Sequence, residues 1–476
     1  MIEESSSENE QKIEKILVNE NNIEQMESDE IKENNTNSYT IKEKKIYILK
    51  GISSIISSMF QTFGNYSIWM LGYTNIYLIS FRWHYNKNID FSYSYYFIPL
   101  MHLSFGLTAP ISGIIEDKFG GKLTIILSYL ILCIAFFIMY YSRSIYIDYS
   151  LILLIGFGIA LGYNITKKNA CSFFMNRKAL VCGIINLISN ILCFGLLFYN
   201  EFDILNYSAR PPSINGIYYR KKIFMNYQKL IIFEIKLLIL TCLGSLLLYF
   251  QNNPKETLKF GFNEKIKVDN NPNNEKIEKK KKKICKNTEI KKSIINKRTI
   301  NLIIMIFLFF PAINFINNDM RMDISLYFFY GLAYHSIGCI SFLLFAIIGN
   351  YIQFRILFVI LSTLLSISVF MATTESPIDL FYFPISIIAS SFVFCGFNVI
   401  FDVHIMKVYG MKNFNQIWGI IRAFGGISEI FGIIFNFIFE NNSSNYKIIY
   451  RTIACLNLFS LILSLFETDD KFNYDK

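Results

Sequence analysis

The chain has 476 residues, of which 53% are hydrophobic and 17% are charged, and its mean hydropathy is positive at +0.36. Soluble domains usually carry about 25% charged residues, so this composition excludes an ordinary soluble enzyme. It also excludes a disordered chain and a disulfide-stapled secreted domain. The hydrophobic residues number about 250 in all, which is enough for twelve membrane-spanning helices of about 20 apolar residues each.

The net charge of +10 does not indicate a nucleic-acid partner, because the excess of lysine lies in one block at residues 255–298. Most of that block, residues 263–298, has no aromatic residue interleaved with its lysines, and the first 40 residues are acidic. Basic segments beside membrane spans are typical of the cytosolic side. We therefore expect a lipid bilayer and no nucleic acid as the surroundings of this chain.

Apolar runs of spanning length recur along the chain and predict an all-α polytopic membrane protein with twelve transmembrane helices in two six-helix pseudo-repeats. Residues 1–45 are acidic and are expected to be disordered, and residues 251–298 read as a Lys-rich linker. The two halves are then 46–250 and 299–466, followed by a tail at 467–476. The twelve predicted spans are 51–80, 94–116, 121–142, 147–168, 179–200, 229–250, 299–317, 325–348, 356–373, 380–402, 416–439 and 447–466.

Lysine and arginine near the span ends predict the orientation of the protein in the membrane. The larger set of these residues lies on the side that includes Lys118, Lys122, Arg177 and the central lysine block. Both termini and the linker are therefore expected in the cytosol, in a plasma or organelle membrane.

Short matches at nearly one offset indicate an internal repeat. The stretch 162–164 corresponds to 396–398, 113–115 corresponds to 346–348, and 183–184 corresponds to 419–420. Because the three matches keep the same order, we interpret the two halves as copies of one six-helix unit. Chance similarity between apolar strings is the alternative.

The connector between the second and third spans reads Gly-Ile-Ile-Glu-Asp-Lys-Phe-Gly-Gly-Lys at residues 113–122. This segment resembles the G-x-x-x-D-R-x-G-R-R signature of the major facilitator superfamily of transporters, and the resemblance implies the major facilitator fold. Gly113 would let two helices approach closely, and Asp117 would face the positive end of a neighbouring helix. Lys118 and Lys122 would hold the connector in the cytosol, and Gly120 would permit its turn.

Two cytosolic loops, 171–183 and 408–419, are similar to those of the monocarboxylate porters and oxalate/formate-type antiporters. The chain departs from that group in the eighth span. Phe342 stands where the group usually carries an arginine, and Gly338 stands where animal monocarboxylate carriers have an acidic residue. The composition, rich in Asn, Lys, Ile and Tyr, resembles that of proteins from malaria-type parasites.

Ionisable residues within spans are costly and indicate functional sites. Arg422 and Glu429 lie seven residues apart in the eleventh span, and therefore on one helix face. We interpret Arg422 as a ligand for an anionic substrate and Glu429 as a proton-coupling acid. The alternative for Arg422 is a structural ion pair with Asp117 or Glu116.

Other polar residues fall in spans that line the central cavity of major facilitator proteins, as the resemblance implies. Each of these residues could instead form a hydrogen bond between helices. His335, in the eighth span, is a candidate for anion or proton coupling with the same alternative. The candidate substrate-binding residues are thus Arg422, His335, Gln61, Asn65, Asn164 and Asn398, and the proton-coupling candidates are Glu429 and Asp402.

These residues favour a monomeric secondary or facilitative transporter, not an enzyme, that moves a small organic solute with or without protons. A monocarboxylate of the pyruvate or lactate type is the first hypothesis for the substrate. A carrier of amino acids or another small metabolite is the second, and a non-transporting receptor or scaffold is the third. We expect no cofactor and no metal, because the nine cysteines are scattered without a CxxC pair.

Overall fold

The computed structural model describes residues 41–69, 71–89, 93, 96–199, 221–252, 296–318, 324–371, 379–431, 433–434 and 446–467. The regular elements of this part of the chain are all helices. The chain divides into two units, Met1–Lys50 and Gly51–Lys476. Of the first unit, the structure describes the start of α2, and all the sites below lie in the second. Most of the predicted disordered N-terminus, linker and C-terminal tail lies outside the described residues.

The first six predicted spans correspond to helices that precede the Lys-rich stretch. The first span is made of two helices, α2 and α3, and the fourth is made of α6 and the short α7. The bounds are α2 (Ile41–Trp69), α3 (Leu71–Tyr85), α4 (Phe97–Phe119), α5 (Gly121–Tyr141), α6 (Ile145–Gly162), α7 (Ile165–Phe173), a 3₁₀ turn at Met175–Arg177, α8 (Lys178–Tyr199) and α9 (Lys221–Leu247).

The last six spans follow that stretch with one helix each. Their bounds are α12 (Lys297–Asn318), α13 (Ile324–Ile348), α14 (Phe354–Met371), α15 (Asp379–Val408), α16 (Gly410–Ile427) and α18 (Tyr446–Ser464). The fold class predicted from the sequence is confirmed. Eight helices of the described part are long and apolar enough to cross a membrane by themselves.

Several helices extend past the predicted ends of the spans. The tenth span was expected to end at residue 402 and the eleventh to begin at 416, but α15 continues to Val408 and α16 begins at Gly410. Gly410 has φ +75°, a left-handed conformation that favours glycine and separates the two helices. The predicted spans were shorter than the helices because Lys407 and Lys412 interrupt the apolar run. A helix can continue past the end of its apolar residues into water.

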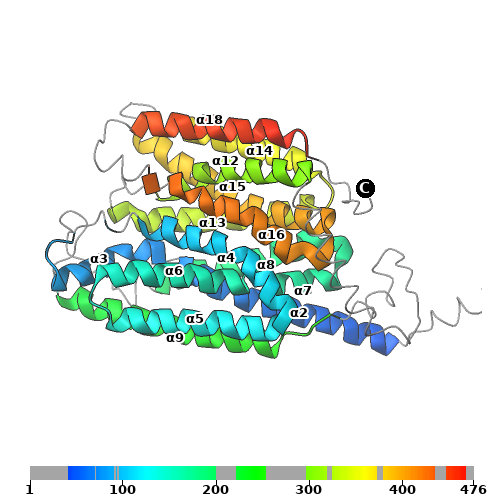
Figure 1. Cartoon of the computed structure of the whole chain (residues 1–476), viewed down its shortest axis with the longest axis horizontal. Helices are drawn as coiled ribbons and strands as arrows, with labels where there is room; N and C mark the ends of the chain where they lie inside the picture. The colour runs from blue at the N-terminus through cyan, green and yellow to red at the C-terminus, as the bar shows by residue number, and fades with distance from the viewer. Residues whose placement is uncertain are drawn as a thin grey trace, which may run out of the picture. The chain divides into compact units, whose positions relative to one another are not determined.

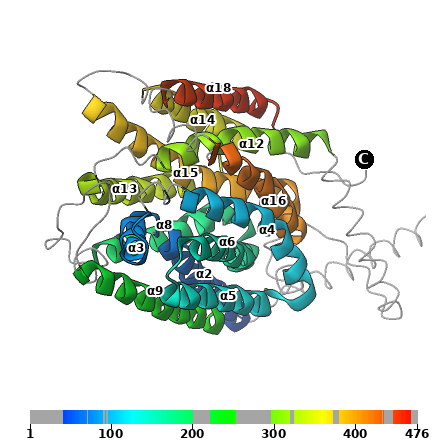
Figure 2. The same ribbon diagram turned by 60° about the vertical axis from the view of Figure 1, so that its left-hand side comes forward.

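The helices pack in two groups, as Figures 1 and 2 show from two directions. In both views α12, α14 and α18 lie together on one side of the second unit, and α5 and α9 lie on the opposite side. Between them, the two halves meet where α4 packs on α16 and where α8 packs on α13. We call the helix ends that carry Lys118, Lys122 and Lys168 the basic end.

Glycine brings α4 and α16 into backbone contact. A β-carbon at Gly106 would lie within 3.0 Å of the backbone of Gly426, and one at Gly419 would overlap the backbone of Ala109. Small residues at helix interfaces are the usual means by which membrane helices gain van der Waals contact. The α4/α16 interface therefore depends on residues that have no side chain.

Candidate functional site

A buried ion pair joins the two halves near the basic end. Lys167 Nζ on α7 lies 2.9 Å from Asp402 Oδ2 on α15, and both side chains are at most 3% exposed. The other carboxylate oxygen, Oδ1, accepts a hydrogen bond of 2.8 Å from Trp418 Nε1 on α16. Asp402, which the sequence nominated for proton coupling, is thus held by a lysine and an indole.

Aromatic rings surround this ion pair. The Tyr163 ring, at the break between α6 and α7, stacks on Trp418 with 5.5 Å between centroids, and Lys167 Nζ lies 4.8 Å from the same tyrosine ring. Phe105 of α4 meets both rings edge-on. The break after Gly162 therefore positions a lysine, a tyrosine and Asn164 within six residues.

Arg422 lies on the same face of α16, one turn beyond Trp418. Its guanidinium carbon is 3.9 Å from the centroid of the Phe310 ring and 5.6 Å from that of Phe105. Its electrostatic neighbours are Tyr163, Asp402 and Glu429. Within the described residues Arg422 forms no ion pair, and its guanidinium lies over aromatic rings.

The structural alternative for Arg422 does not occur among the described residues. Glu116 instead pairs with Lys168 at 3.0 Å and accepts a hydrogen bond from Asn415. Asp117 accepts a hydrogen bond of 2.5 Å from Gln416 Nε2. Both carboxylates therefore meet amide side chains of α16, and Arg422 is further along that helix.

Three buried amides of the N-terminal half have no hydrogen-bond partner in the described part of the chain. These are Gln61 and Asn65 on α2 and Asn164 at the start of α7, and the nitrogen and the oxygen of each are unpartnered. Gln61 approaches Gly162 so closely that a β-carbon there would overlap its Nε2. A buried polar group without a partner costs about 1–3 kcal/mol, so six such atoms together call for an explanation.

The remaining amides belong to contacts between helices or to the core. On α2, Tyr66 donates a hydrogen bond of 3.3 Å to Asn186 Oδ1 on α8. Asn398 is buried on α15, one turn before Asp402. His335 Nδ1 on α13 lies 2.6 Å from Asn190 Oδ1 on α8, and Asn190 Nδ2 donates to the His335 carbonyl. The structure thus gives His335 the helix-to-helix hydrogen bond that was the alternative to a substrate role.

Glu429 is buried beside a histidine of the other half. His102 Nδ1 on α4 lies 3.2 Å from Glu429 Oε1, just past the break that ends α16 at Ser428. The His102 ring also packs against Trp69, with 4.5 Å between centroids. This pair lies toward the end of α4 opposite to the basic end.

The connector that resembles the superfamily signature lies at the basic end. A β-carbon at Gly113 would overlap the side chain of Gln416 and come within 3.0 Å of its backbone nitrogen, so α4 and α16 approach closely at this point. Gly120 has φ +81° and turns the chain between α4 and α5. Lys118 and Lys122 are exposed on either side of this turn.

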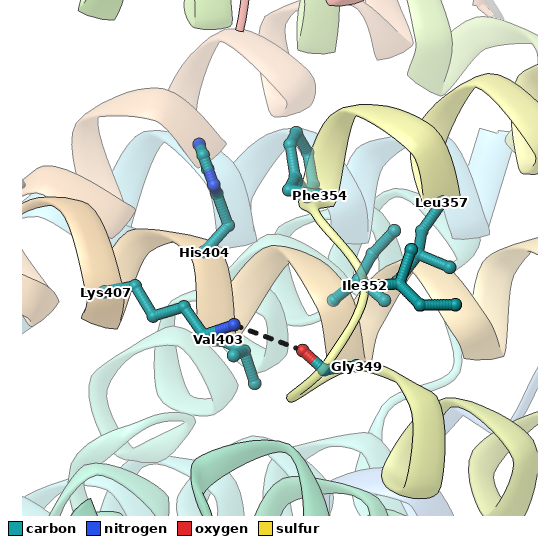
Figure 3. A pocket seen from close by; sticks show the side chains of 8 residues that line it. Gly349, Ile352, Phe354, Leu357, Val403, His404 and Lys407 are labelled. Atoms are coloured by element: carbon teal, nitrogen blue, oxygen red, sulfur yellow. Dashed lines mark hydrogen bonds between the residues drawn. The ribbon is translucent and has the colours of Figure 1, made fainter. Parts of the chain in front are cut away.

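A small hollow lies apart from these residues, at the basic end of the C-terminal half (Figure 3). In it the Lys407 Nζ donates a hydrogen bond of 3.3 Å to the Gly349 carbonyl, and the His404 ring stacks on Phe354 at 4.1 Å. Its lysine is therefore partnered within the protein. Among the described residues there is also no group of three or more side chains suited to hold a metal ion.

Comparisons with known proteins bear on the fold. No family model matches the chain, and no curated protein sequence matches it either. The structure of the proton:xylose symporter XylE, bound to 6-bromo-6-deoxy-D-glucose, superposes with a TM-score of 0.57 at 9% identity, over 88% of this chain and 95% of that one. The fucose:proton symporter FucP from E. coli gives 0.56 at 12% identity, over 88% and 98%.

A third structure, the nucleoside transporter NupG, gives a TM-score of 0.54 at 14% identity and covers 88% of this chain and all of its own. The chain has the major facilitator fold. At these identities the likeness establishes the fold alone. Within the major facilitator fold, α4 and α16 are the second and eleventh helices, and α8 and α13 are the fifth and eighth.

The residues of this site that were not nominated from the sequence include Lys167, Trp418 and Tyr163, and Glu234, outside the site, was not nominated either. Trp418 and Tyr163 read as ordinary aromatic residues, and nothing in their spacing indicates that they stack. Glu234 on α9 is buried within a predicted span, and that placement alone would have identified it.

Proposed function

We propose that this protein moves a small hydroxylated organic anion across a membrane by alternating access of its two halves. The observation that carries this proposal is the set of six unpartnered amide atoms on Gln61, Asn65 and Asn164. Amides donate and accept hydrogen bonds, so they suit hydroxyl groups of a solute. A receptor or scaffold would have no need of buried amides that bond to nothing.

The charge of the solute follows from Arg422. Asp402 already has Lys167 and Trp418 as partners, whereas Arg422 has aromatic rings and no carboxylate among the described residues. A guanidinium binds a carboxylate through two parallel hydrogen bonds, and this interaction is strong where water is excluded. A monocarboxylate of the lactate type, which carries one carboxylate and one hydroxyl group, remains the first candidate within this class.

Exchange between the two open states is supported by the interfaces between the halves. The halves meet through helix pairs and through the Lys167–Asp402 pair, which joins the fourth and tenth helices. Rocking of one half against the other would open the site to each side of the membrane in turn. The conformational residues would be Gly113, Asp117, Lys118, Gly120 and Lys122.

The test is solute exchange in proteoliposomes, with labelled lactate, a sugar, a nucleoside and an amino acid as probes. We expect exchange of lactate or another hydroxy acid, and loss of this exchange in Arg422→Ala. Arg422→Lys keeps the charge but loses the paired hydrogen bonds, so it should weaken affinity about tenfold, or 1.4 kcal/mol.

The matched control is Arg355→Ala, because Arg355 lies on α14 outside the site and bonds the Leu465 carbonyl. Normal hydroxy-acid exchange by Arg422→Ala would reject the anion-binding role. Exchange of the amino acid alone by the wild-type protein would favour the amino-acid carrier.

A further inference from the structure

Glu234 is a buried carboxylate in the sixth span to which no role has yet been given. It is 2% exposed on α9, within the apolar stretch Tyr227–Leu247. Thirteen residues separate it from Leu247, so at 1.5 Å per residue it lies about 20 Å from that end of the helix. Its carboxylate is therefore inside the hydrocarbon region of a membrane about 30 Å thick.

A polar row on α2 leads to Glu234. Ser57 donates to the Ser245 carbonyl of α9 at 2.6 Å, and a β-carbon at Gly64 would overlap the Thr241 hydroxyl. Ser67 follows on α2, where its hydroxyl donates to the Gly64 carbonyl at 2.9 Å, and it lies beside the Glu234 carboxylate. Asn65, one of the unpartnered amides, stands two residues before this serine.

Among the described residues, the groups found around Glu234 include no charged side chain. Oε2 has no hydrogen-bond partner within the described residues, and Cys193 of α8 is a titratable group that interacts electrostatically with Glu234 from another helix. From α5, Tyr129 and Cys133 face α9 at Thr241 and Cys242, about two turns away. On α3, Arg82 is paired with Asp148 and lies against Tyr227, about two turns in the other direction.

The two lysines of α9 nearest to Glu234 in the sequence do not neutralise it. Lys229 and Lys236 are both exposed. At 100° per residue, Lys236 is on nearly the opposite side of the helix from Glu234. The carboxylate thus faces the interior of the half, and the lysines face outward.

The other buried carboxylates of the described part all have a basic partner. Asp148 has Arg82, Asp402 has Lys167, Glu429 has His102, and Glu467 has Arg298. An ionised carboxylate in hydrocarbon without a cation is very costly, so such a group carries a proton instead. Glu234 is in this respect unlike Glu429 and Asp402, the two residues that the sequence nominated.

We propose that Glu234 is the proton-carrying site of this transporter and that it takes up one proton for each solute anion. In the cycle, the carboxylate of Glu234 accepts a proton from water on one side of the membrane and returns it to water on the other. One proton and one monoanion together carry no net charge, so this cycle would not be opposed by the membrane potential. This inference rests on the proposed function, because it names the coupling ion of the same transporter.

The link between the proton and the solute is α2. One face of α2 carries Gln61 and Asn65, and a different face carries Ser67, which lies beside Glu234. Loss of the proton creates a charge that needs hydration, and hydration requires α2 and α9 to separate. Movement of α2 would at the same time shift the two amides that hold the solute.

The experiment measures lactate accumulation, or that of the best-exchanged hydroxy acid, in proteoliposomes under an imposed pH gradient. The wild type should accumulate solute about tenfold for each unit of gradient, since one proton then drives one anion. Glu234→Gln should lose this accumulation but keep exchange of labelled for unlabelled solute. Glu467→Gln is the matched control and should still accumulate solute, because Glu467 is a buried carboxylate that pairs with Arg298 outside the site.

Accumulation by Glu234→Gln at the wild-type level would overturn the proton role. Absence of exchange by the wild type with every solute would instead reject the proposed function, so the two failures are distinct. If Glu234→Gln does not fold, chemical labelling of the wild-type protein decides the question.

Dicyclohexylcarbodiimide adds across a protonated carboxyl: the proton passes to a reagent nitrogen, the oxygen bonds to its carbon, and nothing leaves. Mass spectrometry should find this adduct on Glu234, with less of it at alkaline pH, and little on Asp402 or Asp148. An unlabelled Glu234 at acidic pH would overturn the proposal.

Discussion

The two interfaces between the halves occupy equivalent places in the repeat but differ in chemistry. At α8/α13, Asn190 meets His335 and Cys339, and a β-carbon at Gly183 would overlap the side chain of Ala346. At α4/α16, glycines of one helix contact the backbone of the other. Three carboxylates also lie along this interface: Glu116, Asp117 and Glu429. Among the described contacts, those across α8/α13 involve no ion pair or carboxylate, whereas α4/α16 is charged at both of its ends.

This difference bears on which interface responds to its surroundings. Gly183 and Ala346, which contact each other across α8/α13, are the repeat matches of Gly419 and Gly113, which both lie in α4/α16. The repeat therefore preserves close helix packing but not charge. We expect pH and ionic strength to act on α4/α16 and to leave α8/α13 largely unchanged.

The largest effect is expected from a methyl group in the closest backbone contact. Gly106→Ala would place a β-carbon against Gly426, and because backbone cannot move aside, it should cost about 1–3 kcal/mol. Thermal unfolding in detergent measures this loss. Gly195→Ala is the matched control, since a β-carbon there meets nothing within 4 Å, and it should be neutral or slightly stabilising. Equal unfolding temperatures for the two variants would contradict the close contact.

The next effect concerns the histidine end of α4/α16. His102→Gln should lower stability by up to about 1.7 kcal/mol near neutral pH, because Glu429 loses its basic partner. At acidic pH a protonated Glu429 has less need of that partner, so the difference from the wild type should shrink. Thermal unfolding across a pH series checks this. A difference that stays constant across the series would mean that His102 contributes only packing.

The third effect is expected from substitutions at two matching positions of the repeat, Asp117 and Asn350. Asp117 accepts a hydrogen bond from Gln416, within α16, whereas Asn350, at the matching offset, accepts one from the backbone nitrogen of Ala179 at the start of α8. Asn350→Asp would place a negative charge at a helix N-terminus and should add about 0.3–1 kcal/mol of stability.

Asp117→Asn should lose a similar amount and slow transport at equal abundance, since a charge-assisted hydrogen bond becomes a neutral one. Thermal unfolding and exchange rates measure the two variants together. If both variants lose stability equally, the two positions do not differ in the way that the structure indicates.

The sequence predicted the helices well because each span needs about 20 apolar residues, and these runs are visible without any tertiary information. It predicted the glycine contact at Gly113 because a motif carried it. Asp117 was expected to face the positive end of a neighbouring helix, and the side chain that it meets is the amide of Gln416, near the start of α16. Motif position fixes where a residue lies, but not which atom it meets.

The pairings of the site could not be predicted from the sequence. Lys167 and Asp402 are 235 residues apart, and no local pattern relates them. Arg422 and Glu429 were recognised as buried ions, yet their partners, an aromatic ring and His102, come from other helices. Such pairings are properties of packing between helices, which the spacing of residues along one helix does not contain.

The smallest effect on transport is expected at α8/α13. His335→Gln should leave solute affinity unchanged within about twofold, because His335 meets Asn190 and the solute is bound elsewhere.

Asn190→Ala removes both hydrogen bonds between Asn190 and His335, and it should lower stability by about 0.6 kcal/mol for each bond, the average for polar contacts between membrane helices. Neither variant should change the pH dependence of transport, because the site remains uncharged. Solute exchange at several pH values tests both variants. A tenfold loss of affinity in His335→Gln would return His335 to the substrate site, where the sequence first placed it, and would end the contrast between a charged and an uncharged interface.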